Sequence, residues 1–418
     1  MIWATPNGAA FVGRIHQDLS DGKNVVCVLP QPQLDEDFTP TLDEHFYNNS
    51  QGRLIRLDAT YHPDAIDLVS LFKLGWNWME EGLEADDLVN SLENMWHYFA
   101  NDHDLRFVVL TGLDRLSEED QVKISGNVAA WARFSQQSRT NSQKPAGLRF
   151  LILVSPNFPT FVSDLFLTVH HWWAQTDIVD HQWAFQRLLI DNPPSNLAMD
   201  WWLQAVCRAL GYYDWTMLKL IIDDPPLNFE QIKARIRHHP LFAIGQTGKH
   251  RHAHTGRFLK PLSLKPPRPP DRNPERSMWA DGLFSHSPHH FPHPVLMTDD
   301  QLEYCLSFGQ RQVFLPLVDH VLSMLRQTIE VLFGEGVWDF YEPDESQRSS
   351  IAAEISPLAF FVKKTLPHQK WSNLNERKAL VDMAFAWRTV RHTIAHNRML
   401  DFSNFEIACD RYNACYCI

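Results

Sequence analysis

The chain has 418 residues and a formal net charge of −12, with 44% hydrophobic and 21% charged residues. This length is too great for one ordinary domain and fits two or three. The composition is ordinary for a folded, soluble protein with sizeable cores. Because the net charge is negative, the chain as a whole repels nucleic acid, so any contact with a polynucleotide must come from a local basic patch.

The cysteine pattern and the hydropathy of the chain predict a cytoplasmic protein. Six cysteines are scattered along it: Cys27, Cys207, Cys305, Cys409, Cys415 and Cys417. Cys415 and Cys417 have no second pair to complete a zinc site, so we expect unpaired thiols in a reducing compartment and no metal. No apolar run approaches the roughly 20 residues that a membrane-spanning helix needs.

Residues 1–176 are predicted to form an α/β domain with a parallel sheet. Near-continuous apolar runs are typical of strands buried on both faces, and they lie at Met1–Thr5, Asn24–Pro30, Arg53–Ala59, Arg106–Thr111 and Leu148–Ser155. Helical segments alternate with them, including Asp64–Met79, Asp86–Ala100 and Glu118–Ser135. Such alternation predicts βαβ units with right-handed crossovers.

Residues 177–244 show a purely helical pattern, and we expect a small helical lid domain over one edge of the sheet. Residues 245–297 are predicted to be a stiff, extended linker, because prolines recur from Pro261 to Pro274. The linker is basic, and its cations are Lys249, Arg251, Arg257, Lys260, Lys265, Arg268, Arg272 and Arg276. It is a solvated connector or a surface that touches RNA phosphates.

The linker also carries many histidines: His250, His252, His254, His286, His289, His290 and His293. Their spacing fits no defined metal site.

Residues 298–418 are predicted to form an all-α bundle. Asp299 can cap a long helix that bends at Pro316 and ends at Gly334, and a second long helix runs from about Asn375 to Met399. Both carry apolar residues at three- and four-residue spacing, as bundle helices do.

The first residues have the layout of a phosphate-binding loop. The segment Ile2–Leu19 ("IWATPNGAAFVGRIHQDL") precedes Gly22 and the run "NVVCVLP", so a strand, a glycine-bearing turn, a helix and a second strand are expected. Matching Gly8 and Gly13 to the motif glycines puts Arg14 and Ile15 where Lys and Ser/Thr belong.

A second alignment matches Pro6-Asn7-Gly8 to the turn, and we prefer it because it leaves a more normal helix. It puts Ala10, Phe11 and Val12 at the functional positions, so neither alignment supplies a Lys-Ser/Thr pair.

Two later segments extend this pattern. "RFVVLTGLDRL" is similar to a Walker B strand with Asp114 displaced past Gly112, and "LRFLILVSPN" is similar to a strand whose polar sensor would be Ser155 or Asn157. The layout over roughly residues 1–240 resembles a STAND-type ATPase module of the AAA+ kind. Without the Lys-Ser/Thr pair, the resemblance implies a degenerate, catalytically dead P-loop domain without a cofactor, left to bind nucleotide weakly or to act as a scaffold. A plain α/β domain unrelated to ATPases is the alternative.

The segment 388–398 ("RTVRHTIAHNR") holds an Arg-x-x-x-x-His element formed by Arg391 and His396, with the polar His392 directly after the arginine. This element on a late helix of an all-α bundle resembles the HEPN family of metal-independent endoribonucleases. The resemblance covers about residues 298–418. It implies that Arg391 and His396 are catalytic, and that the site is completed by a second motif across a homodimer.

The chemistry of RNA cleavage suits these residue types. An imidazole can take and return protons near neutral pH, and a guanidinium stabilises the charge that develops on the phosphate. Arg391 and His396 point about 140° apart on a helix, so one motif does not form a tight pair. Arg388 and His392 share a face and could support the site.

Three structural interpretations of the side chains in and near this motif stay open. The arginines near the end of the helix also suit its C-terminal dipole, and His396 could simply bond a carbonyl group. Asp319 and Glu330 could position the arginine or belong to ordinary surface.

These observations favour a metal-independent ribonuclease of a prokaryotic anti-phage system, regulated by a dead ATPase-like domain. The competing interpretation is a non-enzymatic adaptor or RNA-binding scaffold that works beside a partner ATPase or sensor protein.

Overall fold

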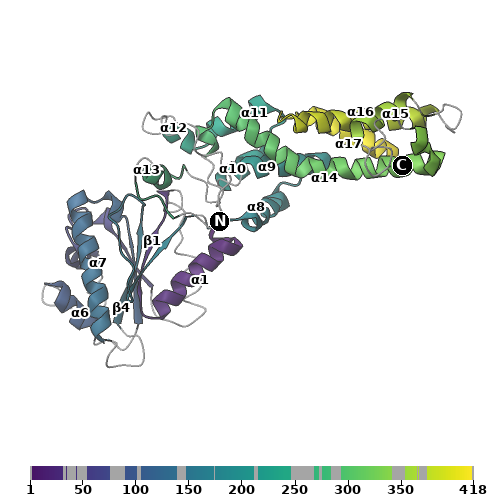
Figure 1. Ribbon diagram of the computed structural model, residues 1–418. Coiled ribbons are helices and arrows are strands. Elements are labelled where there is room, and N and C mark those ends of the chain that lie inside the picture. Colours follow the sequence, from purple (N-terminus) through teal and green to yellow (C-terminus); the bar gives the residue numbers. More distant parts are fainter. Residues whose placement is uncertain are drawn as a thin grey trace. The chain divides into compact units, whose positions relative to one another are not determined.

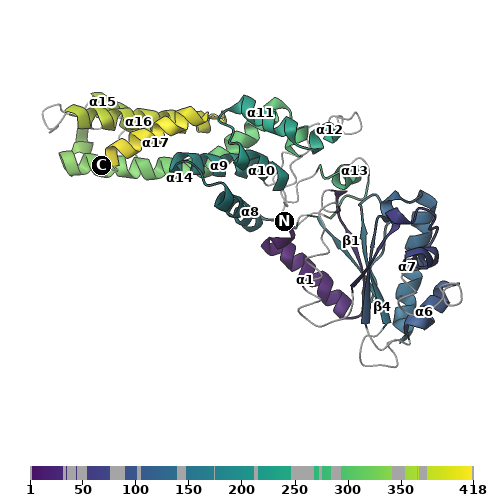
Figure 2. The ribbon, with the colours of Figure 1, turned by 180° about the vertical axis from the view of Figure 1, so that it is seen from behind.

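The chain forms a mixed structure with a five-stranded parallel sheet and many helices (Figures 1 and 2). The computed structural model describes residues 2–31, 34, 44, 54–75, 90–100, 105–138, 147–173, 175–210, 215–245, 268–272, 275–283, 293–340, 354–364, 366 and 374–416. None of the helices in these ranges is both long enough and apolar enough to cross a lipid bilayer.

The chain divides into two compact units. The first contains Met1–Asp180 and Ile244–Pro292, and the second contains His181–Ala243 and His293–Ile418.

A parallel sheet forms the centre of the first unit. Its strands are β1 (Asn24–Val28), β2 (Leu54–Asp58), β3 (Leu105–Thr111), β4 (Gly147–Val154) and β5 (Leu167–His171), in the order β2-β3-β4-β1-β5. All four pairings are parallel. The apolar runs that predicted β1 to β4 are therefore confirmed as strands. The fifth strand was not predicted, because "LTVHH" lacks a continuous apolar run.

Helices cover both faces of this sheet. Figure 1 shows α1 (Pro6–Ser20) on one face and α6 (Leu92–Ala100) and α7 (Glu118–Ser138) on the other, and α4 (Leu68–Gly75) packs against α7. Under α1 the core includes Phe11, Val12, Ile15 and Leu19 against the inner side chains of β1, β3 and β4. Coverage of both faces is the arrangement that a parallel sheet requires.

The first residues do not form the strand expected at Met1–Thr5. Ile2–Ala4 form a 3-10 helix instead, and α1 begins at Pro6. Thr5 is the N-cap, because its hydroxyl accepts a hydrogen bond from the Gly8 amide at 3.2 Å. A threonine followed by proline at the first helical position is a strong start signal, and it outweighs the short apolar run before it.

Part of the segment expected to be a linker folds onto the first unit. Residues 275–280 form α13, whose Arg276 donates to the carbonyl oxygens of Pro156 and Phe158. Trp279 is buried, and its ring lies 5.3 Å from that of Trp173. Burial of this tryptophan makes α13 a part of the unit's core. Residues 246–267, 273–274 and 284–292 of the predicted linker lie outside the described part of the chain.

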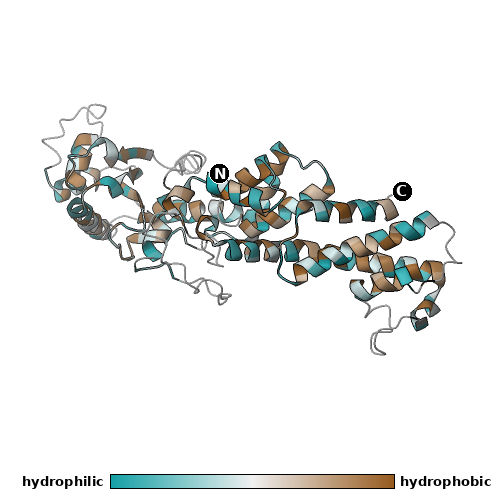
Figure 3. Ribbon diagram, turned by 90° about the horizontal axis from the view of Figure 1, so that it is seen from above, coloured by the Kyte–Doolittle hydropathy of each residue, from teal (hydrophilic) through white to brown (hydrophobic). Residues whose placement is uncertain are grey.

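The second unit is helical. Its helices include α9 (Leu197–Leu210), α10 (Trp215–Asp223), α11 (Phe229–His238), α14 (Asp299–Phe333), α15 (Ile355–Lys364), α16 (Leu374–Ala395) and α17 (Phe402–Tyr416). Apolar and polar residues alternate around these helices (Figure 3). This pattern is typical of helices that bury one face each.

The helix α9 packs closely on α14. A Cβ at Gly309 of α14 would collide with the carbonyl oxygen of Ala205, so glycine permits this close approach. Trp202 also stacks near Phe314, with ring centroids 6.4 Å apart. We expected residues 177–244 to form a separate lid, but 181–243 share one core with the C-terminal helices.

The longest helix, α14, runs unbroken through Pro316 and ends before Gly334, which has φ 82°. Its cap is Thr298, one residue before the Asp299 that we expected. The Thr298 hydroxyl accepts from the Gln301 amide, and the Gln301 side chain accepts from the Thr298 amide at 3.0 Å. This reciprocal capping box satisfies two helix-end donors.

A charged cluster links the end of α1 to β5. The Asp18 carboxylate accepts from Lys23 Nζ at 2.6 Å and lies 2.8 Å from Nε2 of His170. Burial alone would raise the pKa of Asp18, but the hydrogen bonds from Lys23 and His170 outweigh it and hold the pKa below its usual value.

This lowered pKa predicts a pH-dependent contribution to stability. Because the folded-state pKa of Asp18 lies below its unfolded-state value of about 3.9, the contribution is complete above that value and is lost as the pH falls through the folded-state pKa. We expect Asp18→Asn to reduce the free energy of urea unfolding near pH 6, and the deficit to shrink below about pH 4. A deficit that stays constant across this range would contradict the prediction.

Candidate functional site

The rotation of α16 is fixed by its buried side chains. Met383, Trp387, Val390 and Ile394 follow one another at four- and three-residue spacing, and all are buried. They face the other helices of the bundle, since α16 packs on α14, α15 and α17 and Trp387 lies edge-on to Phe405 at 6.1 Å. The residues on the opposite side of α16 therefore face solvent.

The helix α16 ends within the motif that we singled out. Ala395 is its last residue, and Asn397 has φ 55°, in the left-handed region. The Arg398 amide donates to the carbonyl group of Thr393 at 3.2 Å, and the Asn397 amide donates to that of Ile394 at 3.3 Å. This pair of bonds is a Schellman motif, in which asparagine is the common substitute for glycine.

The two histidines of the motif lie together at this helix end. His392 and His396 are one turn apart, both are exposed, and their ring centroids are 4.3 Å apart at an interplanar angle of 63°. The His396 amide donates to the His392 carbonyl group at 3.2 Å. The structure thus presents two adjacent imidazoles to solvent.

Arg388 is held by the neighbouring helix. Its Nε donates to the Ser356 hydroxyl of α15 at 2.9 Å, and its guanidinium lies over the Phe360 ring at 4.9 Å. Arg388 thus has a packing role between α15 and α16. This role is independent of the supporting role that the sequence analysis gave it beside Arg391 and His396.

Arg391 lies on the flank between the buried and exposed sides of α16 and is half-buried. In the described part of the chain, no hydrogen bond, ion pair or ring contact joins Arg391 to His396. The separation of about 140° that a regular helix imposes explains this. One chain therefore brings together His392 and His396, but not Arg391 and His396.

The two acids that could have positioned the arginine have other surroundings. Glu330 accepts from Nε1 of Trp338 at 2.8 Å, and Asp319 is exposed on α14.

The turn expected to bind phosphate is closed by the protein itself. Asp180 places one carboxylate oxygen 2.8 Å from the Asn7 amide and the other 2.7 Å from the Asn7 side-chain nitrogen. The Gly8 amide is bonded to Thr5. A carboxylate at a helix N-terminus occupies the place that an anion would take.

The positions where a catalytic lysine and a Ser/Thr would stand are also unsuitable. Phe11 and Val12 belong to the core under α1, with exposed fractions of 1% and 0%. In the other alignment, Gly13 and Arg14 lie in the middle of α1, where Arg14 donates to Gln175 at 2.9 Å. Neither alignment thus leaves a loop around a phosphate.

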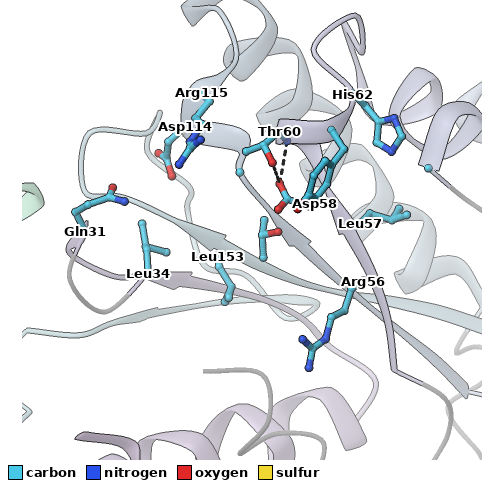
Figure 4. A pocket seen from close by; sticks show the side chains of 14 residues that line it. Gln31, Leu34, Arg56, Leu57, Asp58, Thr60, His62, Asp114, Arg115 and Leu153 are labelled. Carbon is cyan, nitrogen blue, oxygen red and sulfur yellow. Dashed lines mark hydrogen bonds between the residues drawn. The ribbon is translucent and has the colours of Figure 1, made fainter. Parts of the chain in front are cut away.

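A cavity of about 540 Å³ lies at the carboxyl ends of β2 and β3 (Figure 4). The residues that line it include Gln31, Arg56, Asp58, Thr60, His62, Asp114 and Arg115. The carboxyl ends of parallel strands are the usual place for ligands in such sheets. Asp58 and Thr60 were missed from the sequence, although their position directly at the end of a buried run is a signal for this edge.

The structure joins Asp114, which was expected at the Walker B position, to Ser155, one of the two residues expected at the sensor position. Asp114 accepts from the Ser155 amide at 2.9 Å and from its hydroxyl at 2.8 Å. Burial raises the pKa of Asp114, and the Ser155 bonds partly offset this. Gly112, with φ 71°, lets the chain turn between β3 and Asp114, and a Cβ there would collide with the Asp58 carboxylate. Asp114 is thus largely satisfied by the protein.

No group of three or more metal-ligating side chains lies close enough to hold a metal ion within the ranges described. No protein-family model matches the chain, and no curated protein sequence matches it significantly.

The Schellman motif at the end of α16 gives a direct prediction. Asn397→Ala places a Cβ-bearing residue without a polar side chain in the left-handed region, and we expect it to lower the free energy of unfolding by about 1 kcal/mol. Asn397→Gly should be neutral or slightly stabilising, because glycine adopts this conformation freely. Urea unfolding of both variants measures this, and equal effects would argue against the cap.

Proposed function

We propose that the C-terminal helices form a HEPN-like, metal-independent endoribonuclease. The observation that supports this most is the exposed pair of imidazoles, His392 and His396, 4.3 Å apart at the end of α16. The half-buried guanidinium of Arg391 lies on the flank of the same helix end.

In this proposal His396 is the general acid and base. It removes the proton of a ribose 2′-hydroxyl, or protonates the leaving 5′-oxygen, which are the two proton transfers that metal-free cleavage of RNA needs. Arg391 stabilises the charge that builds up on the phosphate, a role that suits the fork of a guanidinium. Arg388 and His392 support the two catalytic residues from the neighbouring turn.

The proposed enzyme is a homodimer. Since Arg391 and His396 point away from each other on one helix, a single chain offers only half of a site. A two-fold axis near the end of α16 would bring Arg391 of one copy towards His396 of the other, because such an axis pairs each surface with its own copy.

The α/β unit is, in this proposal, a degenerate ATPase-like module that regulates the nuclease and needs no cofactor. The Asp180 carboxylate at the start of α1 and the buried Phe11 support the loss of ATP hydrolysis there. We further propose a cytoplasmic anti-phage role, in which a trigger or a partner ATPase or sensor protein releases RNA cleavage.

A second candidate function is a non-enzymatic adaptor or RNA-binding scaffold. It is favoured by the packing of Arg388 against Ser356 and Phe360, which gives one of the four motif residues a structural role. In that case the helix end binds RNA without cutting it.

RNA cleavage in EDTA tests the proposal. We expect the wild-type chain to cut RNA under an activating condition, and His396→Ala to lower the rate by about 100-fold or more, because general acid-base catalysis contributes that much. His238→Ala is the matched control, since His238 is also an exposed histidine at a helix end in the same unit.

Equal cleavage by the wild type and His396→Ala would exclude His396 as the catalytic group. Binding of RNA with no cleavage under any condition would favour the adaptor.

A further inference from the structure

A band of cations and aromatic rings runs along α15 and α16 towards the two histidines. We call it the cationic–aromatic stripe, and it consists of Phe360, Lys363 and Lys364 of α15 and Lys378, Phe385, Arg388, His392 and His396 of α16.

The α16 members of the stripe share one side of the helix. At 100° per residue, the five side chains from Lys378 to His396 fall within an arc of about 80°, opposite the buried Trp387 and Val390. They extend over about 27 Å at 1.5 Å per residue. A strand of several nucleotides can follow a surface of this length.

The two phenylalanines form the centre of the stripe. Their rings meet edge to face, with centroids 5.3 Å apart, and Phe360 is 40% exposed. An exposed aromatic ring on a helix surface costs solvation energy and offers a flat face to a ligand.

Three cations surround these rings. Lys363 lies 5.2 Å from the Phe385 centroid, Lys364 lies 5.7 Å from that of Phe360, and Arg388 lies 4.9 Å from Phe360. Contacts of this kind place positive charge close to the aromatic faces.

Among the described residues, no acidic side chain balances the charge of the cations around the two rings. In the described part of the chain, no carboxylate pairs with Lys363, Lys364 or Arg388. The acid of α16 nearest in sequence to Phe385, Asp382, lies 3.9 Å from Arg411 of α17 instead. A local excess of positive charge on a chain with net charge −12 indicates an anionic ligand.

We propose that the cationic–aromatic stripe binds single-stranded RNA and directs it along α16 to the histidine pair. Unpaired bases stack on Phe360 and Phe385, and Lys363, Lys364 and Arg388 contact the phosphates. Stacking on an aromatic ring needs an unpaired base, which a duplex does not offer. The direction towards the histidines rests on the proposed nuclease function, whereas binding by the stripe does not.

A second copy of the chain fits the stripe less well than RNA does. A two-fold contact centred on Phe360, away from the end of α16, would place Lys363 and Lys364 of one copy against those of the other, and like charges in contact disfavour association.

The test is fluorescence anisotropy with a labelled single strand of 2′-O-methyl RNA. This strand lacks the free 2′-hydroxyl, so binding is measured without cleavage. We expect Phe360→Ala to weaken binding about tenfold, and Phe360→Trp to retain it. Phe308→Ala is the matched control, because Phe308 is 43% exposed on α14 of the same unit, and it should leave binding unchanged.

The salt dependence tests the cations. We expect the double change Lys363→Ala, Lys364→Ala to weaken binding and to reduce the slope of log Kd against log salt by about 1.4, which is about 0.7 per lost phosphate contact for a single strand. Lys219→Ala, at an exposed lysine of α10, is the control and should leave the slope unchanged.

Four results would overturn the proposal. The first is that Phe360→Ala and Phe308→Ala change the affinity for the RNA strand equally, and the second is that a duplex of the same sequence binds as tightly as the single strand. The third is that an acidic peptide competes for binding as well as unlabelled RNA does. The fourth is that a variant which loses RNA binding also loses the dimer in sedimentation. Binding by the stripe without any cleavage of ordinary RNA would reject the nuclease and leave the stripe intact. RNA cleavage that the stripe variants leave unchanged would reject the stripe and leave the nuclease intact.

Discussion

Burial of one side of α16 is the constraint on which the candidate site depends. Met383, Trp387, Val390 and Ile394 pack into the bundle, and this fixes the rotation of the helix. A helix turned by one residue would bury His392 or expose Trp387, and both changes are costly. The same packing that stabilises the bundle therefore decides that the two histidines face solvent, and that Arg391 stands apart from them on the flank.

In the first unit, too, residues that could have bound a ligand stabilise the fold instead. The residues that would form a phosphate loop are used as a helix cap and as core. Thr5 and Asp180 satisfy the first amides of α1, and Phe11 lies under the helix against the sheet. Asp114 and Ser155 satisfy each other at the carboxyl ends of β3 and β4. A cavity beside Asp58, at the carboxyl ends of β2 and β3, stays open.

Local sequence signals predicted the parts of the fold that depend on local physics. Four strands followed from β-branched apolar runs, and both long C-terminal helices followed from their periodicity. The start of α1 was missed because a short apolar run was given more weight than the Thr-Pro cap. The grouping of 181–243 with the C-terminal helices was missed because it depends on the close approach of α9 to α14 at Gly309. No local sequence pattern predicts that contact.

The candidate site was predictable only in part. The spacing of Arg391 and His396 already implied that they diverge on one helix. The end of α16 at Ala395 depends on Asn397 adopting a left-handed conformation, and the sequence analysis carried the helix on to Met399. The pairing of Arg388 with Ser356 and Phe360 could not be predicted, because it depends on how α15 packs against α16.

The central claim is that each chain supplies half of an RNA-cleaving site. It is tested most directly by mixing two inactive variants, Arg391→Ala and His396→Ala, after exchange of subunits. If one site takes its arginine from one copy and its histidine from the other, the mixture should recover about a quarter of wild-type cleavage, since half of the dimers are mixed and each holds one complete site. If the wild type cuts RNA and the mixture recovers nothing, the shared site is contradicted.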